Sequence, residues 1–174
     1  MSRGTKKVQA LIKRKSGIML DVSLGGPPQP RSIALRIDGD VRHHPAKVPF
    51  PLPNECVHTA IVLHVLEYLE PKTFFRWWDE LWRVMQPNGV VYVSGPYGGD
   101  ESQGWLSDPE HKTRVIEQTF AWLDPRTPVY AMHADVGRKR PKPWYPLTIA
   151  RVPGTHGTFG YNVTMRKPSA KEMR

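Results

Sequence analysis

The hydrophobic residues in the middle of the chain predict a strand, a helix and a second strand. Residues 56–63 form a short, nearly continuous apolar run rich in β-branched side chains, as expected of a strand that is covered on both faces. From Pro71, which is expected to open the helix, large apolar side chains recur at steps of three and four residues. The resulting stripe consists of Phe74, Trp77, Trp78, Leu81, Trp82 and Met85. The helix is expected to end within residues 86–89, and the β-branched run at 89–94 predicts the second strand. Such a unit pairs its two strands in parallel.

The segment before this unit predicts two further strands with no helix between them. Residues 17–22 and residues 33–37 are both apolar enough for core strands. Prolines at positions 27, 28 and 30 interrupt the connection, so we expect a loop there.

The segment after the unit predicts a polar loop, a helix and a hairpin. Residues 98–113 are polar and are expected to cover the carboxyl end of the sheet as a lid. Residues 115–123 predict a helix, and residues 129–133 predict a strand. The alternating runs at 147–152 and 158–165 flank the sequence PGTHG and predict an antiparallel hairpin.

The composition is that of a chain with one hydrophobic core. The 174 residues are 39% hydrophobic and include six Trp and five Phe, which is enough for one domain and short for two. A single cysteine, Cys56, excludes an internal disulfide, and its place in a predicted strand favours a buried structural thiol over a nucleophile. No apolar run approaches the ~20 residues of a membrane helix, and no signal-peptide core follows the basic N-terminus. We therefore expect a cytoplasmic protein.

The net charge of +9 is concentrated at the two ends of the chain. We divide the chain into a basic N-terminal arm at 1–16, a single domain at 17–167 and a basic tail at 168–174. Basic ends attract phosphate groups or an acidic protein surface, although solvated tails have the same composition. Residues 137–146 interleave Lys and Arg with Trp144 and a tyrosine. This pattern can bind single-stranded nucleic acid by charge and stacking, or tether the chain into a partner's groove.

Residues 49–96 resemble class I S-adenosylmethionine-dependent methyltransferases, because both the order and the spacing of shared residues agree. The shared residues are Pro49, Phe50, Pro51, Val57, His64, Val65, Leu66, Glu67, Leu69, Glu80, Arg83, Val84, Pro87, Gly89 and Pro96. A later fragment, residues 108–111 with Thr119 and Phe120, resembles a short subgroup often encoded by phages. The resemblance implies an α/β, Rossmann-like methyltransferase fold. Its mostly parallel sheet would end in a C-terminal antiparallel hairpin, and its N-terminal half would be shortened.

The resemblance also implies a cofactor, S-adenosylmethionine, at the carboxyl ends of the first strands. Asp21 ends the first strand, and Gly25 and Gly26 stand in the glycine-rich turn, where a Cβ would occupy space that the cofactor fills. Ser23 and Leu24 stand where the first glycine and its neighbour are usual, so the cofactor motif is degenerate.

Three positions that the resemblance expects to be acidic hold other residues. The ribose-binding position is Arg36, which has donors only, although Asp38 lies two residues further on. His44 stands near the adenine-binding position, where a neutral imidazole can accept one hydrogen bond. His58 is the third such position. The adjacent His43 and His44 point to opposite sides of an extended chain, so we expect no metal site.

Leu63 and His64 follow at the carboxyl end of the central strand, the edge at which open α/β sheets bind ligands. We expect both to contact the cofactor. His64 is also a candidate catalytic residue, with a packing or helix-capping role as the alternative. Asp108 and His111 are candidate acid/base residues in the polar loop, although an Asp-Pro turn that orders the loop accounts for them as well.

These residues predict a methyltransferase-like protein with an unknown acceptor and a partly degraded cofactor site. Methyl transfer requires the cofactor and the nucleophile to be held in line rather than a strong acid or base. The alternative is a catalytically inactive methyltransferase-fold protein that serves as a structural, assembly or nucleic-acid-binding module, in the host cytoplasm or a phage virion. Its partners would be nucleic acid or virion proteins, bound through the basic termini and residues 137–146. We expect no membrane contact.

Overall fold

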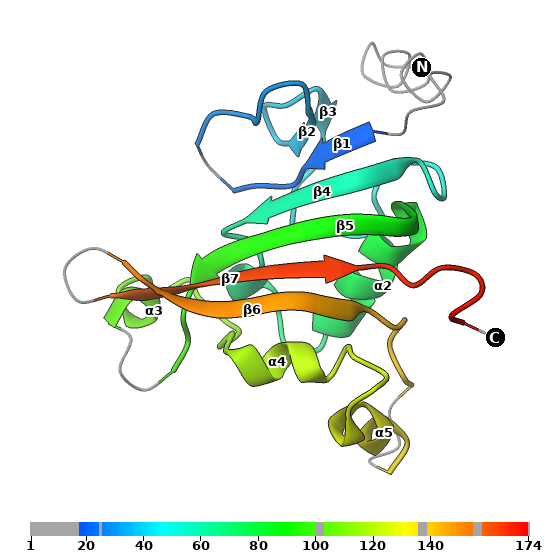
Figure 1. Cartoon of the computed structure of the whole chain (residues 1–174). Helices are drawn as coiled ribbons and strands as arrows, with labels where there is room; N and C mark the ends of the chain where they lie inside the picture. Colours follow the sequence, from blue (N-terminus) through cyan, green and yellow to red (C-terminus); the bar gives the residue numbers. More distant parts are fainter. Residues whose placement is uncertain (1–17, 25, 100–102, 136–138, 155–157, 174) are drawn as a thin grey trace.

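Seven strands pair into one sheet in the order β3-β2-β1-β4-β5-β7-β6 (Figure 1). The structure is a computed structural model that describes residues 18–24, 26–99, 103–135, 139–154 and 158–173. The strands are β1 (Ile18–Asp21), β2 (Ile33–Arg36), β3 (Val41–Arg42), β4 (Val57–Leu63), β5 (Met85–Pro96), β6 (Tyr145–Pro153) and β7 (Phe159–Arg166). The helices are the 3-10 turn η1 (Leu66–Tyr68), α2 (Phe74–Val84), α3 (Gln103–Leu106), α4 (Glu117–Ala121) and α5 (Pro128–Asp135). The predicted N-terminal arm lies outside the described residues.

The sheet is parallel from β3 to β5 and antiparallel at its C-terminal end. β1 pairs in parallel with β2 and with β4, and β4 pairs in parallel with β5. β7 runs antiparallel between β5 and β6. The predicted fold class, a mostly parallel α/β sheet with a C-terminal hairpin, is therefore confirmed, and the four parallel strands β1, β2, β4 and β5 direct their carboxyl ends to one edge.

The N-terminal half of the sheet is built without a helix between β1 and β2. Bends and turns connect them through the described residues 22–24 and 26–32, as the prolines in this stretch require. The shortened N-terminal half is thus a property of the fold.

Helix α2 packs its aromatic stripe behind the sheet (Figure 1). Trp77 and Trp78 are fully buried, and the indole N–H of Trp77 donates a hydrogen bond to the carbonyl of Pro45 at 2.9 Å. The helix begins at Phe74 rather than at Pro71, because the preceding residues form a turn in which the N–H of Thr73 donates to the carbonyl of Glu70. One face of α2 thereby fixes the loop that precedes β4.

Residues 129–133 form part of helix α5 and not the predicted strand. Pro128 stands at the first position of the helix, where its fixed φ favours the helical start. The hydroxyl of Thr127 accepts a hydrogen bond from the N–H of Tyr130 at 3.3 Å. His133 is fully buried, with its ring 4.8 Å from that of Phe75. Capping and this tertiary contact outweigh the strand pattern.

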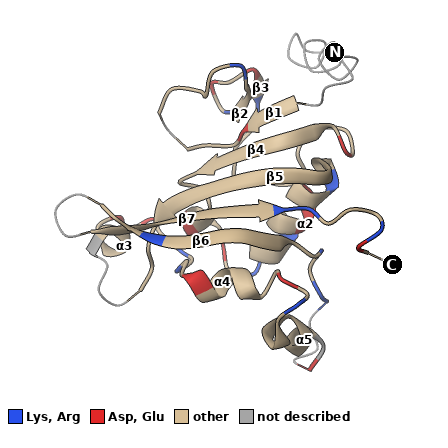
Figure 2. Cartoon of the chain, viewed as in Figure 1, with Lys and Arg blue, Asp and Glu red and all other residues tan. Residues whose placement is uncertain are grey.

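The central strands are almost free of charged side chains, as the tan ribbons in Figure 2 show. Trp144, in the predicted basic aromatic segment, is fully buried with its ring 5.4 Å from that of Trp78. It therefore has no exposed face on which a base could stack. No helix among the described residues is long and apolar enough to cross a membrane.

Lys167 closes the carboxyl end of α2 from the far end of the chain. Its side chain is fully buried, and its ammonium donates to the carbonyls of Met85 at 2.8 Å and Trp82 at 3.1 Å. The same nitrogen lies 3.6 Å from the centre of the Trp82 ring and 3.4 Å from the Glu55 carboxylate. Burial lowers the pKa of Lys167, and the Glu55 carboxylate partly offsets that effect. The negative end of the helix dipole stabilises a cation at this place.

We expect Lys167→Ala to lower the free energy of unfolding by about 3 kcal/mol, because two buried carbonyls lose their donor. Chemical denaturation of wild type and variant measures this difference. Lys171→Ala, a change of an exposed lysine in the tail, is the matched control and should stay within about 0.5 kcal/mol of wild type. Equal stability of all three proteins would contradict the assignment of Lys167 as a helix-end partner.

Candidate active site

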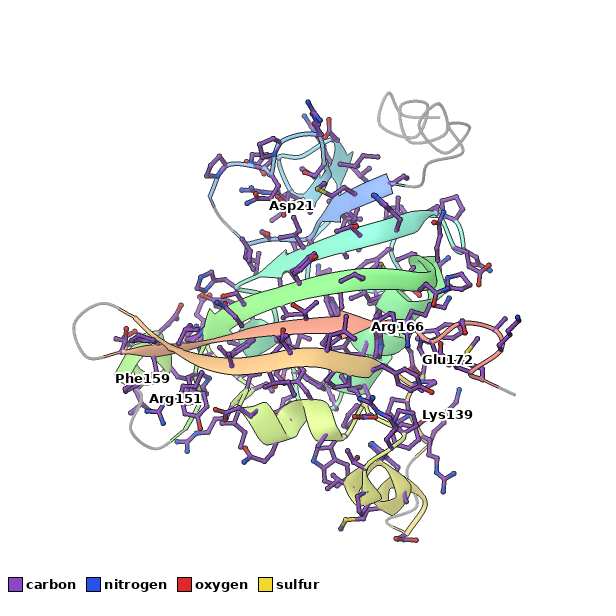
Figure 3. All side chains as sticks on the ribbon, in the orientation of Figure 1. Asp21, Lys139, Arg151, Phe159, Arg166 and Glu172 are labelled. Carbon is purple, nitrogen blue, oxygen red and sulfur yellow. The ribbon has the colours of Figure 1, made fainter. Side chains whose placement is uncertain are left out.

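The strands β1, β4 and β5 end together, so the loops that follow them share one edge of the sheet. The N–H of Leu24 donates to the carbonyl of Leu63 at 3.0 Å, and the N–H of His64 donates to the carbonyl of Ser94 at 3.0 Å. Figure 3 shows Asp21 at the tip of β1, and Arg151 with Phe159 farther along the same edge. The Arg151 guanidinium lies 3.7 Å from the centre of the Phe159 ring.

Asp21 orders the first loop of this edge. Its carboxylate is 1% exposed and accepts hydrogen bonds from the backbone N–H groups of Ser23 at 3.0 Å and Gln29 at 2.8 Å. The Ser23 hydroxyl is buried and has no hydrogen-bond partner among the described residues. Gly26 has φ +68°, and a Cβ built on it would meet no atom within 4 Å, so this turn borders open space. Gly25 lies outside the described residues.

Arg36 joins the end of β2 to the same loop. Its guanidinium donates to the carbonyl of Gly26 at 2.5 Å and lies 3.4 Å from the carboxylate of Asp38. The Asp38 side chain is largely exposed, whereas the Arg36 side chain is 11% exposed. The position that the resemblance assigns to a ribose acceptor is therefore occupied by a donor that already has two partners.

A cavity of about 650 Å³ opens beside this loop. Its lining residues come from the first loop, the segment before β4, η1 and the polar loop, and they are Leu24, His44, Ala46, Tyr68, Pro109, Glu110 and Lys112. Nδ1 of His44 accepts a hydrogen bond from the N–H of Ala46 at 3.2 Å, which leaves the ring proton on Nε2. Burial lowers the pKa of His44, with smaller contributions from the charges of Lys47 and His43. The cavity has the volume of a small-molecule site.

His64 and Glu67 form a pair at the tip of β4. Nδ1 of His64 lies 3.1 Å from Oε1 of Glu67, and the His64 side chain is 60% exposed while that of Glu67 is fully buried. The hydrogen bond that Glu67 accepts from His64 raises the pKa of His64, and partial burial only partly offsets this effect. The backbone carbonyl of Glu67 accepts the N–H groups of Lys112 at 2.7 Å and Thr113 at 3.0 Å. One residue thus holds both the imidazole and the end of the polar loop.

The other oxygen of this carboxylate lies next to a buried tyrosine hydroxyl. A Cβ built on Gly95 would lie 2.7 Å from the Tyr161 hydroxyl and 3.1 Å from Oε2 of Glu67. Neither of these two polar atoms has a hydrogen-bond partner among the described residues. Burial and the charge of Glu67 raise the pKa of Tyr161 well above its ordinary value, so its hydroxyl stays protonated. A side chain larger than that of glycine at position 95 would therefore contact both groups.

Asp108 and His111 meet within the polar loop. The Asp108 carboxylate accepts the Tyr68 hydroxyl at 2.7 Å and the N–H of Glu110 at 2.8 Å, and these bonds lower its pKa. Nδ1 of His111 donates to the carbonyl of Trp105 at 2.8 Å. These contacts order the loop, and they join it to η1 through Tyr68. Among the described residues, no group of three or more His, Cys, Asp or Glu side chains is arranged to hold a metal ion.

Sequence reasoning placed His64 at this edge but missed the partners that give it a role. Glu67 was noticed as a shared residue, and Tyr161 lies on the inward face of the predicted hairpin. Gly95 follows a β-branched run, a place where a glycine in a strand often marks a close approach. Long-range packing determines which of these residues come into contact. The order of hydrophobic and polar residues along the chain does not predict these contacts.

Comparisons with known proteins support the fold. Neither a protein-family model nor a curated protein matches the chain. The chain is similar to the 1,6-didemethyltoxoflavin-N1-methyltransferase of Burkholderia thailandensis, solved with 1,6-didemethyltoxoflavin and S-adenosylhomocysteine. The TM-score is 0.56 with 13% identity, over 95% of this chain and 77% of that one.

Two further solved structures match over nearly the whole chain. One is a variant of the 16S rRNA (adenine(1408)-N(1))-methyltransferase from Catenulisporales acidiphilia, with TM-score 0.53 and 10% identity over 95% of this chain and 90% of that one. The other is the [4+2]-cyclase SpnF, with TM-score 0.53 and 12% identity over 95% of this chain and 82% of that one. The chain therefore has a Rossmann-like methyltransferase fold, as the resemblance implied.

We expect Gly95→Ala to lower the free energy of unfolding by about 1–3 kcal/mol, because the new methyl group meets the buried Tyr161 hydroxyl. Removing that hydroxyl in Tyr161→Phe should recover most of the loss in the double variant. Thermal denaturation of the two single variants and the double variant measures the coupling. Purely additive losses would show that Gly95 and Tyr161 do not compete for this space.

The His64–Glu67 pair should stabilise the fold mainly at acidic pH. Because the folded-state pKa of His64 is raised, its contribution is fully present below the ordinary value of 6.5 and is lost as pH rises through the folded-state value. His64→Asn, in which asparagine tolerates the positive φ, should be less stable by up to about 1 kcal/mol at pH about 5. The difference should shrink toward pH about 8 in denaturation curves, and a pH-independent difference would refute the pairing.

Proposed function

We propose that this protein is an S-adenosylmethionine-dependent methyltransferase that holds its cofactor in the cavity at the carboxyl edge of the sheet. The observation that carries the proposal is the cavity of about 650 Å³ in a sheet with the methyltransferase fold. Its wall includes Leu24 from the loop after β1 and Tyr68 from the turn after β4. Ligands of open α/β sheets bind at this edge. The fold alone does not fix a reaction, so the proposal rests on the residues of this cavity.

The loop after β1, which contributes Leu24 to the cavity wall, leaves room for this cofactor. Gly26 borders open space, and the Ser23 hydroxyl is a buried polar atom without a partner among the described residues. Asp21 and Gly26 from the first loop, His44 from the cavity wall and Leu63 at the tip of β4 would hold the cofactor. When bound, S-adenosylmethionine supplies an electrophilic methyl group, and its sulfur keeps the bonding pair after transfer.

A second candidate function, a non-catalytic binding or assembly module, is favoured by one contact. The Arg36 guanidinium donates to the carbonyl of Gly26 and cannot accept hydrogen bonds from ribose hydroxyls. A domain that has lost this acceptor retains the fold while the cofactor binds weakly. The phage-type origin inferred from residues 108–111, and a role in a virion, belong to this second candidate.

Isothermal calorimetry with S-adenosylmethionine separates the two candidates. We expect wild type to bind, and Arg36→Glu to bind about tenfold more tightly, because a carboxylate accepts from the ribose hydroxyls and a charged hydrogen bond contributes about 1.5–3 kcal/mol. The control Arg76→Glu makes the same charge change at an exposed position on α2 and should leave the affinity unchanged.

Two other outcomes point away from an active enzyme. Binding by Arg36→Glu but not by wild type favours the inactive module, with Arg36 as the change that removed the cofactor. Absence of both heat and a thermal shift in both proteins at millimolar cofactor refutes the methyltransferase proposal.

A further inference from the structure

The backbone around His64 is joined to the wall of the cavity by two hydrogen bonds. Leu24 and Tyr68 both line the cavity. The N–H of Leu24 donates to the carbonyl of Leu63, immediately before His64, and the N–H of Tyr68 donates to the carbonyl of Val65, immediately after it. His64 therefore lies in the chain between two residues that hydrogen-bond to cavity-lining residues. Its side chain is 60% exposed.

The backbone of His64 is held in an unfavourable conformation. Its φ is +54°, in the left-handed region that residues other than glycine rarely adopt. Its N–H donates to the carbonyl of Ser94 on the neighbouring strand, which holds the conformation in place. Strain of this kind persists where the surrounding structure fixes a side chain in one direction.

The buried carboxylate of Glu67 determines which nitrogen of His64 carries the proton. An ionised carboxylate only accepts hydrogen bonds, so the neutral imidazole places its proton on Nδ1, toward Oε1 of Glu67. Nε2, which does not contact Glu67, then carries the lone pair that can accept a proton. This is the logic of a histidine base oriented by a buried acid.

The other titratable groups near the pair do not compete with Glu67. Burial raises the pKa of Tyr161 well above its ordinary value, and burial with Asp108 raises the pKa of Tyr68 to about 12, so both hydroxyls are neutral at neutral pH. Lys112 from the polar loop pairs with Glu70 at 2.8 Å.

We propose that His64 is the general base of the methyl transfer and that Glu67 is its positioning residue. The proposal rests on the proposed function and names the class of acceptor, a molecule whose nucleophilic oxygen or nitrogen carries a proton. Nε2 of His64 takes that proton, the acceptor atom uses the released electron pair for its new bond to the methyl carbon, and the imidazolium then returns the proton to water. Acceptors such as carboxylates, which have no proton to lose, would gain nothing from this base.

A histidine with a raised pKa is suited to this task near neutral pH. General-base catalysis is most effective when the pKa of the base is close to the working pH, and it contributes about 10²–10⁴-fold in rate. A purely structural His64–Glu67 contact would hold η1 in place equally well with the ring in either tautomer. The tautomer and the pKa of His64 therefore distinguish the two roles.

Nuclear magnetic resonance of the full chain labelled with ¹⁵N-histidine tests the proposal without any cofactor. We expect the neutral form of His64 to carry its proton on Nδ1, with a pKa above that of an ordinary histidine. Glu67→Gln should lower this pKa by about one unit or more, because a nearby opposite charge shifts a pKa by about 1–3 units. The control Glu70→Gln removes an exposed carboxylate that pairs with Lys112 instead, and it should leave His64 unchanged. A proton on Nε2 of wild-type His64 overturns the proposal, even if Glu67→Gln fails to fold.

Diethyl pyrocarbonate, which acylates a bare imidazole nitrogen, provides the second measurement. We expect His64 to be acylated at Nε2, with a rate that rises through the pKa measured by resonance. An unreactive His64 overturns the proposal, because its Nε2 would then be unable to take a proton from an acceptor. If His64 has the expected tautomer and reactivity but calorimetry shows no cofactor binding, the methyltransferase function is refuted. The orientation of His64 by Glu67 is then still supported. Cofactor binding with the opposite tautomer refutes only the general base.

Discussion

The buried carboxylate of Glu67 connects more parts of this molecule than any other polar group of the candidate site. One oxygen holds His64, the other lies beside Gly95 and the Tyr161 hydroxyl, and the backbone carbonyl of the same residue fixes the end of the polar loop. A carboxylate without water is costly unless its oxygens are compensated. His64 compensates one oxygen, whereas the other has no hydrogen-bond partner among the described residues. The tip of β4, Gly95 of β5, Tyr161 of β7 and the end of the polar loop all lie beside this residue. The candidate active site is the consequence of this arrangement.

The shortened N-terminal half of the sheet requires side chains at the same edge to order the loop after β1. With no helix between β1 and β2, the connecting loop is ordered by two side chains, Asp21 from β1 and Arg36 from β2. Arg36 serves this structural role at the position where the resemblance expects a ribose acceptor. The loop and the proposed cofactor would thus make opposite demands on Arg36, because a guanidinium that donates to a carbonyl cannot also accept a hydrogen bond.

The fold and the site carry different information. Structures with this fold include enzymes whose names refer to 1,6-didemethyltoxoflavin, to 16S ribosomal RNA and to a [4+2] cyclisation. The sheet supplies an edge where loops converge, and the side chains of those loops determine what is bound and what reacts there. In this chain those side chains include His44, which lines the cavity, and the His64–Glu67 pair at the tip of β4.

The residues that follow a local periodicity could be assigned from the order of amino acids alone. The aromatic helix and the C-terminal hairpin repeat their apolar residues with the period of the element that they form, and the continuous apolar run at 56–63 predicted β4. The second strand was predicted only at 89–94, whereas β5 begins at Met85, directly after α2 ends at Val84. The assignment of 129–133 as a strand was wrong because Thr127 caps a helix there and His133 packs against Phe75, a residue far away in the chain.

The polar residues depended on three-dimensional packing instead. Lys167 is the last residue of the predicted domain, next to the basic tail, and its side chain is buried at the end of α2. Trp144, which the sequence suggested for stacking, is buried against Trp78. The role of Glu67 depends on a loop about 45 residues later and on a tyrosine in the last strand. Buried hydrophobic residues recur with the period of the helix or strand, so they can be recognised in the sequence. A hydrogen bond between distant segments depends on donor–acceptor distances to within a few tenths of an ångström, and no sequence period reports it.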